Sequence, residues 1–400
     1  MNLLEIRDLD KKYYMNTFGE RKAVAFERGE GIYLYGSDGK RYVDFFAGIA
    51  VNILGHSHSG FTDAICNQAK KLLHTSNLYY SENQAKLAQK ICDNSCADKV
   101  FFANSGAEAN EGALKLARIY HYKALNRSET SSKMQGEPRN KFVTLENSFH
   151  GRTLATVAAT GQPKYQKPYK PLLQEFVHVP ANDMAALENA IDDKTAGVIF
   201  EVVQGESGVH PLKIEYLARA RELCDRFGAL LIFDEVQTGM GRTGALFAYQ
   251  QSGIEPDIFT LAKALGGGVP ISAVCAKDKF AAFEPGEHGT TFGGNPFACR
   301  AGLAVFEAIE KENLVKNSRV MGDFLQEKLR EIGIKEVRGC GLMIAADIED
   351  APSIVQKLFE KGYLVGCVGN TLRILPPLIV NKDQIQSFVE VLAKVYFDRN

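Results

Sequence analysis

The feature that most constrains the fold is a regular alternation between residues 98 and 280. Stretches with helical spacing separate short apolar runs, which span residues 100–103, 142–145, 176–179, 198–203, 230–233, 258–261 and 271–276. Strands that are apolar on both faces are typical of a parallel sheet with helices packed on both sides. We therefore expect an α/β protein built on a mostly parallel sheet.

Smaller units should flank this sheet, because 400 residues exceed what one compact core usually holds. Two alternating runs around residues 37–40 (Ser-Asp-Gly-Lys) predict a hairpin, and residues 58–95 have the spacing of two helices. Residues 125–140 are polar and predict an exposed loop. We predict an N-terminal segment with a β-hairpin over 1–57, a large α/β domain over 58–295 and a smaller C-terminal α+β domain over 296–400. In the last of these, we expect a long helix, then strands at 337–346, 364–368 and 372–375, and a final helix.

The composition narrows the class of protein. A net charge of −1 with 24% charged residues gives no reason to expect a nucleic acid or an anionic membrane as partner. No apolar stretch reaches the length of a membrane span, and the N-terminus lacks a signal-peptide pattern, so we predict a cytoplasmic location. The eight cysteines contain no C-x-x-C pair and predict reduced thiols. His56 and His58 have no acid or cysteine cluster beside them, so we expect no metal site.

Ligands of such sheets bind outside the carboxyl ends of the strands. One strand should end near Ala103, and a helix should start near Ala107. The first N–H groups of that helix suit a phosphate, because they have no intrahelical acceptor and carry partial positive charge. Simple capping by Asn104 or Ser105 is the alternative explanation.

Two later strands run into charged residues. Asp234 directly follows the apolar run 230–233, where an acid is costly to bury without a partner. Lys263 follows the run 258–261 and precedes three glycines. A desolvated amine has a lowered pKa and attacks carbonyl groups. Taken singly, Asp234 fits a structural cap or ion pair, and Lys263 fits a side chain that reaches solvent.

The three features together indicate one cofactor. Pyridoxal phosphate needs a phosphate cup, an acid for its ring nitrogen and a lysine for its aldehyde. The chain supplies these in the order of successive strands. The glycines at 266–268 do not form the G-x-G-x-x-G fingerprint, which argues against a dinucleotide-dependent dehydrogenase.

On these residues the chain resembles the class III aminotransferases of fold type I over nearly its whole length. The resemblance rests on Lys263 and on four motifs in the family's order: SGAEANE at 105–111, FHGRT at 149–153, DEVQTG at 234–239 and HGTTFGGNP at 288–296. It implies a pyridoxal-phosphate enzyme with Lys263 as the Schiff-base lysine and Asp234 at the pyridinium nitrogen. The other cofactor contacts that it implies are Ser105, Gly106 and Ala107 at the phosphate, Phe149 and Val236 on the ring faces, Glu235 and Gln237 near the ring, and Thr291 at the phosphate of a neighbouring subunit. A homodimer with shared sites follows from the last contact.

The resemblance also implies two substrates, an ω-amino donor and 2-oxoglutarate. Arginine suits carboxylates because of its bidentate fork. We expect Arg152 to bind the donor carboxylate and Arg373 the α-carboxylate of glutamate or 2-oxoglutarate. We expect Glu206 to neutralise Arg373 while the donor reacts, and Thr290 to hydrogen-bond the donor. A structural ion pair between Glu206 and Arg373 is the alternative.

Gly48 bears on the choice of donor. Ornithine aminotransferases of the family carry a tyrosine where Gly48 aligns, and a glycine leaves room for an N-acyl group. We therefore expect N2-acetylornithine as the donor, giving N-acetylglutamate 5-semialdehyde and glutamate, as in arginine biosynthesis. Ornithine and succinyl-diaminopimelate remain alternative donors. An aminomutase and a non-catalytic pyridoxal-phosphate-binding protein are the rival functions.

Overall fold

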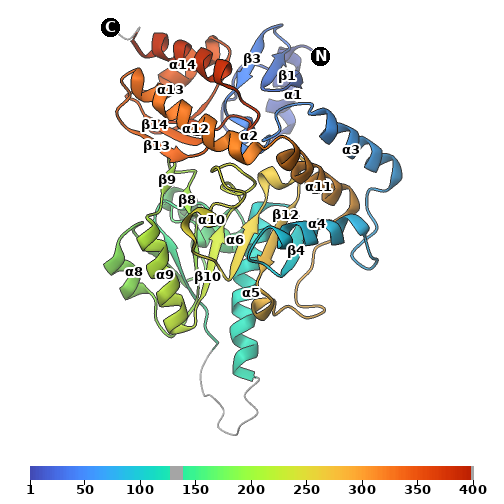
Figure 1. Cartoon of the computed structure of the whole chain (residues 1–400), viewed down its shortest axis with the longest axis vertical. Coiled ribbons are helices and arrows are strands. Elements are labelled where there is room, and N and C mark those ends of the chain that lie inside the picture. The colour runs from blue at the N-terminus through green and yellow to red at the C-terminus, as the bar shows by residue number, and fades with distance from the viewer. Residues whose placement is uncertain (127–137, 398–400) are drawn as a thin grey trace.

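The computed structural model describes residues 1–126 and 138–397, and a seven-stranded sheet forms its centre (Figure 1). The strand order is β4-β12-β11-β10-β7-β5-β6. Only β12 among these seven strands runs antiparallel to its neighbours, β11 and β4. The bounds are β4 (Lys99–Ala103), β5 (Lys141–Leu145), β6 (Phe176–Val179), β7 (Thr195–Phe200), β10 (Leu230–Asp234), β11 (Ile258–Leu261) and β12 (Ser272–Ala276). Each strand contains or overlaps one of the predicted apolar runs.

Both faces of this sheet are buried. In β10, Leu230 and Ile232 pack in the cluster that includes Ala113 of α5 (Gly106–Asn126), whereas Leu231 and Phe233 belong to the larger core on the opposite face. Alternate side chains of a strand point to opposite faces, so a strand covered on both sides must be apolar throughout. The helices α8 (Met184–Ala190) and α9 (Ile214–Phe227) lie on the second face. The expected α/β fold, with a mostly parallel sheet and helices on both faces, is confirmed.

The two ends of the chain meet in a second sheet, ordered β1-β2-β3-β15. The hairpin predicted around residues 37–40 joins β2 (Tyr33–Gly36) to β3 (Arg41–Asp44), after β1 (Phe26–Glu30). The strand β15 (Tyr363–Leu364) pairs with β3 in parallel, so blue and red segments lie together in Figure 1. Early and late segments of the chain therefore support each other.

A third sheet, ordered β13-β14-β17-β16, completes the C-terminal region. Its strands are β13 (Val337–Cys340), β14 (Met343–Asp347), β16 (Gly366–Val368) and β17 (Thr371–Ile374), and the helices around them are α12 (Leu314–Glu331), α13 (Ala351–Glu360) and α14 (Lys382–Phe397). The remaining helices include α1 (Leu3–Tyr13), α3 (Ser59–Lys71), α4 (Glu82–Asp93) and α11 (Pro296–Lys311). The two helices predicted over 58–95 correspond to α3 and α4. Among the residues that the structure describes, no helix is both long and apolar enough to cross a membrane.

Two predicted strands are interrupted. The run 198–203 splits into the end of β7 and the short β8 (Val203–Gln204), because Glu201 turns inward to accept backbone N–H groups. The run 337–346 is a hairpin that turns at Gly341, whose φ is 51° and whose added Cβ would lie 2.4 Å from backbone of Thr243. Most of the predicted loop at 125–140 lies outside the described residues, since α5 extends to Asn126 and residues 127–137 are not described.

Candidate functional site

A cavity of about 710 Å³ opens at the carboxyl ends of β10 and β11, where the sequence predicts the ligand site. The expected residues that line this cavity are Gly48, Ser105, Gly106, Ala107, Phe149, Arg152, Glu206, Asp234, Val236, Gln237, Lys263 and Arg373. They come from all three regions of the fold. The structure thus brings together side chains that are as far apart in the sequence as Gly48 and Arg373.

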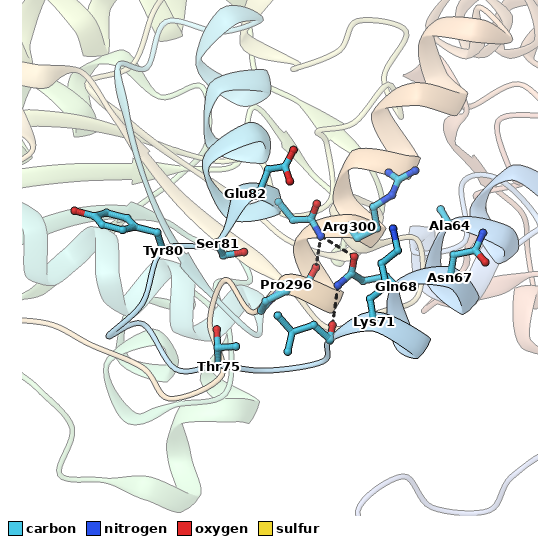
Figure 2. Close-up of a pocket in the computed structure, with 12 residues that line it drawn as sticks. Ala64, Asn67, Gln68, Lys71, Thr75, Tyr80, Ser81, Glu82, Pro296 and Arg300 are labelled. Atoms are coloured by element: carbon cyan, nitrogen blue, oxygen red, sulfur yellow. Dashed lines mark hydrogen bonds between the residues drawn. The ribbon is translucent and has the colours of Figure 1, made fainter.

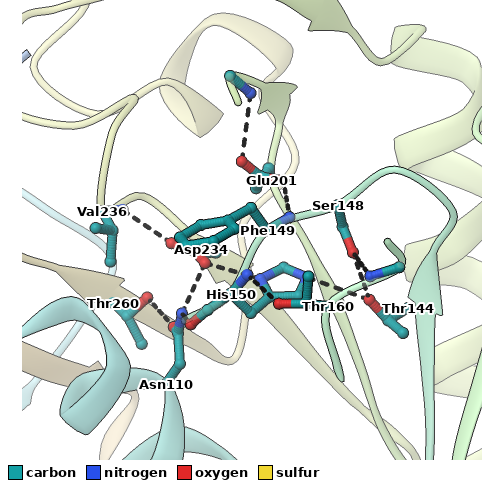
Figure 3. A network of polar contacts seen from close by, with 12 residues as sticks. Asn110, Thr144, Ser148, Phe149, His150, Thr160, Glu201, Asp234, Val236 and Thr260 are labelled. Atoms are coloured by element: carbon teal, nitrogen blue, oxygen red, sulfur yellow. Dashed lines mark hydrogen bonds and ion pairs between the residues drawn. The ribbon is translucent and has the colours of Figure 1, made fainter. Parts of the chain in front are cut away.

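Asp234 ends β10 and lies at the centre of a buried network (Figure 3). Its Oδ2 accepts hydrogen bonds from Asn110 Nδ2 at 2.7 Å and from His150 Nδ1 at 2.8 Å, and its Oδ1 accepts from the Val236 N–H at 3.0 Å. The amide oxygen of Asn110 accepts from Thr260 Oγ1 at 2.7 Å, which turns the Asn110 NH₂ group toward Asp234. These donors fix the direction of the carboxylate and offset the cost of burying it.

The histidine in this network is oriented by hydrogen-bonding contacts at both ring nitrogens. A carboxylate only accepts hydrogen bonds, so His150 Nδ1 carries the proton that is shared with Asp234. The other ring nitrogen, Nε2, lies 3.2 Å from Thr144 Oγ1. His150 therefore holds Asp234 from one side as Asn110 does from the other.

A second buried acid lies beside this network. Glu201 follows β7 and accepts from two backbone groups, the N–H of Phe149 at 3.0 Å and the N–H of Gly205 at 3.3 Å. Burial raises the pKa of Glu201 to about 7, which nearby His150 opposes and Asp234 reinforces. The same sequence signal, an apolar strand that ends in an acid, marks both Glu201 and Asp234.

Lys263 follows β11 and starts the 3₁₀ turn η2 (Lys263–Gly266). Its φ is 43°, in the left-handed region that a non-glycine residue seldom adopts, at a cost of order 1–3 kcal/mol. Burial lowers the pKa of Lys263 from 10.5 to about 8, although the charges of Asp234 and Glu201 favour its protonated form. The side chain is therefore a partly buried amine whose pKa lies far closer to neutral pH than that of an ordinary lysine.

The start of α5 forms another wall of the cavity. The N–H groups of Asn104 and Ser105 donate to Glu108 at 2.8 Å each, and Ser105 Oγ accepts from the Glu108 N–H at 3.2 Å. The N–H groups of Gly106 and Ala107 belong to the first helical turn and have no intrahelical acceptor. The helix start is therefore capped, as the alternative explanation predicted, and the N–H groups of Gly106 and Ala107 are still available as donors. Those two donors suit an anion.

The two arginines differ in their surroundings. Arg152 is exposed, and its guanidinium lies 3.8 Å from the ring centre of Tyr165 and 5.5 Å from that of Phe149. Arg373 of β17 is 6% exposed. Its Nη2 donates to Gln237 Oε1 at 3.3 Å, and its Nε has no partner in the part of the chain that the structure describes. Burial lowers the pKa of Arg373.

The expected pair between Glu206 and Arg373 is not formed in this structure. The oxygens of Glu206 accept instead from Gln162 Nε2 at 2.6 Å and Tyr165 Oη at 2.7 Å. Within the described residues, no ion pair or hydrogen bond joins Glu206 to Arg373. The structural-pair alternative therefore does not describe this conformation either.

Gly48 lies on an unusual turn, α2 (Ala47–Ala50), in which four successive residues have φ between 48° and 66°. Asp44 Oδ1 accepts from the N–H groups of Phe46 and Ala47, and His56 Nε2 lies 2.9 Å from Asp44 Oδ2. His56 thus supports the turn that carries Gly48 to the cavity. The other histidine of this segment, His58, contacts Glu312.

Three expected residues lie elsewhere. Glu235, which we expected near the cofactor, points away from the cavity, because its carboxylate accepts from Thr238 Oγ1 and from the N–H groups of Ala248 and Tyr249. Thr290 Oγ1 accepts from Asn104 Nδ2 at 3.2 Å, and Thr291 is exposed. Neither threonine lines the cavity of this chain.

A second hollow of about 590 Å³ lies between α3, α4 and α11 (Figure 2). Several of its polar side chains bond to one another or to neighbouring residues. Asn83 Nδ2 donates to Gln68 Oε1 and to the Pro296 carbonyl, each at 3.0 Å, and Arg300 forms a two-point ion pair with Glu307. None of the expected site residues lines this hollow.

Several residues of the main site escape sequence reasoning. Asn110 and His150 lie inside the motifs at 105–111 and 149–153. The local sequence does not show that both side chains contact Asp234. Gln162 and Tyr165 follow the FHGRT motif and carry no pattern of their own. Glu201 had a usable signal, since it follows an apolar strand as Asp234 does.

Comparison with known proteins agrees with this geometry. The family model of class III aminotransferases matches residues 14–396. The acetylornithine aminotransferases of Methanocaldococcus jannaschii and Caldanaerobacter subterraneus are 50% and 48% identical, and each match covers at least 96% of both chains. Among solved structures, the ornithine aminotransferase of Toxoplasma gondii superposes with a TM-score of 0.91 at 31% identity, over 100% of this chain and 96% of that one. The acetylornithine aminotransferase of Elizabethkingia anophelis gives 0.85 at 32% identity over the whole of both chains. The chain belongs to the class III aminotransferases, as its motifs predicted.

Proposed function

We propose that this aminotransferase moves the ω-amino group of N2-acetylornithine to 2-oxoglutarate, giving N-acetylglutamate 5-semialdehyde and glutamate, a reaction of arginine biosynthesis. The observation that carries the proposal is the identity of 45–50% to acetylornithine aminotransferases from several organisms over 96% or more of this chain. Class III aminotransferases use pyridoxal phosphate.

The cavity fits this cofactor. Gly106 and Ala107 line the cavity at the start of α5, and an added Cβ at Gly106 would lie 2.7 Å from Val236 Cγ1, so the glycine lets Val236 pack beside the expected phosphate position. We assign the phosphate to the N–H groups of Gly106 and Ala107, and to Ser105 beside them. Asp234 would face the ring nitrogen, Phe149 and Val236 the two faces of the ring, and Gln237 its hydroxyl. When bound, pyridoxal phosphate withdraws electrons from the substrate carbon that loses its proton.

The protein contributes a base and a fixed charge. Lys263 in its neutral form takes the proton from the substrate carbon and returns it to the neighbouring position, and proton transfer of this kind typically contributes about 10²–10⁴ fold. Asp234 is held by Asn110 and His150, so its oxygens need no reorganisation when charge develops. A preorganised acid and a buried amine on adjacent strands are what the chemistry requires.

The substrates differ in where they carry a carboxylate. We assign the carboxylate of the donor to Arg152, at the mouth of the cavity, and the α-carboxylate of 2-oxoglutarate to Arg373, in its interior. Gly48 leaves space beside the donor for an N-acetyl group. Thr290 remains a predicted contact of the amino-donor substrate, although in this structure its hydroxyl accepts a hydrogen bond from Asn104.

Ornithine is the second candidate donor, because solved ornithine aminotransferases share this fold with TM-scores up to 0.91. The test is kcat/KM of the holoenzyme with N2-acetylornithine, ornithine and N-succinyl-diaminopimelate, each with 2-oxoglutarate. We expect a clear preference for N2-acetylornithine. Equal or better use of ornithine contradicts the assignment of Gly48.

We also propose a homodimer with shared sites. The segment between α3 and α4 and the loop that carries Thr291 expose large apolar side chains: Leu72, Leu73, Leu78, Tyr79, Tyr80 and Phe292. A surface of this kind is typical of an interface. Sedimentation should give the mass of a dimer. The variant T291A should bind pyridoxal phosphate more weakly and should still be a dimer. The cytoplasmic location stays a prediction from the sequence.

A further inference from the structure

Glu206 and Arg373 line one cavity, yet the structure keeps them apart. Among the described residues, Arg373 makes one long hydrogen bond, 3.3 Å to Gln237, and its buried Nε lacks a partner. Among the charged groups that favour the protonated form of Arg373, Glu206 has the largest effect. The two side chains therefore attract each other, so other interactions must keep Glu206 away from Arg373.

Two residues do so. Tyr165 of α7 (Pro163–Gln166) donates to Glu206 Oε1 at 2.7 Å, and Gln162 donates to Glu206 Oε2 at 2.6 Å. Hydrogen bonds to a charged group are stronger than those between neutral groups. Both of these bonds must break before Glu206 can reach Arg373.

Both holding residues are themselves well anchored. Gln162 is buried and also donates to the Ser148 carbonyl at 3.1 Å. The ring of Tyr165 lies edge-on to Phe149 at 5.9 Å and carries the Arg152 guanidinium on its face at 3.8 Å. They can therefore hold Glu206 in one place.

We propose that Tyr165 and Gln162 are positioning residues that set the acceptor preference by holding Glu206 away from Arg373. Held there, Glu206 leaves Arg373 charged and free for the α-carboxylate of a 2-oxo acid. Released, it covers Arg373 and excludes that carboxylate, which suits the ω-amine of the donor. The inference rests on the proposed function, because it concerns the same two substrates.

Tyr165→Phe tests this directly, since it removes the hydroxyl and keeps the ring beneath Arg152. The probe is glutarate, an unreactive dicarboxylate, titrated calorimetrically into the holoenzyme. We expect the Kd of glutarate to rise about tenfold. The half-reaction with 2-oxoglutarate should lose a similar factor in kcat/KM, while the half-reaction with N2-acetylornithine stays within about twofold of wild type.

Three further variants sharpen the result. Tyr169→Phe, on the exposed end of the neighbouring 3₁₀ turn η1 (Lys167–Tyr169), is the matched control and should change nothing. Gln162→Leu should weaken glutarate binding as Tyr165→Phe does. In a Glu206→Ala background, Tyr165→Phe should have no further effect, because the residue it acts through is gone.

Other outcomes overturn the inference. Equal losses in both half-reactions indicate a purely structural role for Tyr165, and an unchanged glutarate affinity shows that Glu206 is not restrained by it. An effect that persists in Glu206→Ala leads to the same conclusion. If wild type fails to use N2-acetylornithine but glutarate binding depends on Tyr165, the donor assignment fails and the inference stands.

Discussion

At the scale of single residues, two acids at the ends of the adjacent strands β10 and β7 have different hydrogen-bond donors. Asp234 contacts the side chains of Asn110 and His150, whereas Glu201 accepts from the backbone N–H groups of Phe149 and Gly205. Burial therefore raises the pKa of Glu201 to about 7 from an ordinary value of 4.5. Glu201 is thus neutral in the folded protein over a pH range in which the unfolded chain has lost that proton.

Replacing Glu201 with Gln should reveal this in the pH dependence of stability. Between about pH 4.5 and 7 the folded state binds the extra proton, so its free energy of unfolding falls as the pH rises, by about 3 kcal/mol in total. Glu201→Gln removes this loss. Urea unfolding of the apoprotein at pH 5, 6, 7 and 8 measures it, and the stability of the variant relative to wild type should increase with pH. Parallel pH profiles of the two proteins contradict the prediction.

The lowered pKa of Lys263 has a kinetic consequence. Only the neutral amine attacks an aldehyde, and the neutral fraction grows tenfold per pH unit until the pKa is reached. The rate at which the apoprotein binds pyridoxal phosphate covalently should therefore rise from pH 6 and level off above about pH 8. Stopped-flow absorbance measures this rate, with Nα-acetyl-lysine as the control amine. A protein rate that keeps climbing past pH 9, as the control does, contradicts the burial of Lys263.

The sequence predicts part of this site. Asp234 and Lys263 could be found because each lies at or just after the end of an apolar strand, and parallel strands end at one edge of a sheet. The partners of Asp234 could not be found from the sequence. Asn110 lies 124 positions and His150 84 positions away from Asp234 in the chain, and only the fold brings them into contact. The contacts of Glu206 with Gln162 and Tyr165 depend in the same way on side-chain positions that no local pattern encodes.

At the scale of elements, the start of α5 is shaped by one close approach. An alanine at position 106 would bring its Cβ within 2.7 Å of Val236 Cγ1, so either the helix or the loop after β10 must shift. Overpacking of this kind costs about 1–3 kcal/mol. Because both residues line the cavity, Gly106→Ala should weaken pyridoxal-phosphate affinity roughly 5- to 100-fold.

The matched control is Gly60→Ala in the first turn of α3. An added Cβ there meets nothing nearer than 3.5 Å. This variant should leave cofactor affinity unchanged and leave the apoprotein as stable as wild type or slightly more so. Fluorescence titration with pyridoxal phosphate compares the two variants, and equal affinities for both contradict the prediction.

The elements themselves were largely predictable, because strands buried on both faces must be apolar throughout. The prediction missed interruptions that depend on tertiary contacts. Residues 198–203 looked like one strand, but Glu201 leaves it to bond with the N–H groups of Phe149 and Gly205. The left-handed turn at 47–50 depends on Asp44 and His56, and its residues other than Gly48 give no sign of positive φ.

At the scale of the whole molecule, Arg242 joins the large sheet to the C-terminal region. It is fully buried, and its Nη1 donates to the carbonyls of Leu342 at 2.9 Å and Pro376 at 2.5 Å. Burial lowers the pKa of Arg242 to about 9. Pro376 follows β17, the strand that carries Arg373, so Arg242 also supports the substrate end of the cavity.

Arg242→Ala should therefore affect both stability and substrate binding. Loss of the two hydrogen bonds and of the buried side chain should lower the free energy of unfolding by about 3–5 kcal/mol and raise the KM for 2-oxoglutarate. Arg319→Ala is the control, because Arg319 also binds a carbonyl, that of Gly244, but lies partly in solvent. Urea unfolding of both variants measures the difference. Similar small losses would show that Arg242 does not join the two regions.

The covalent site is the centre of this description. Sodium borohydride treatment of the protein loaded with pyridoxal phosphate, followed by peptide mass spectrometry, locates the lysine that holds the cofactor. We predict that the reduced cofactor is attached to Lys263, beside Asp234 at the ends of β10 and β11. The Lys263→Ala variant should carry no attached cofactor on the peptide that contains position 263. A label on another lysine, or none on the loaded wild-type protein, contradicts the assignment of this cavity as the active site.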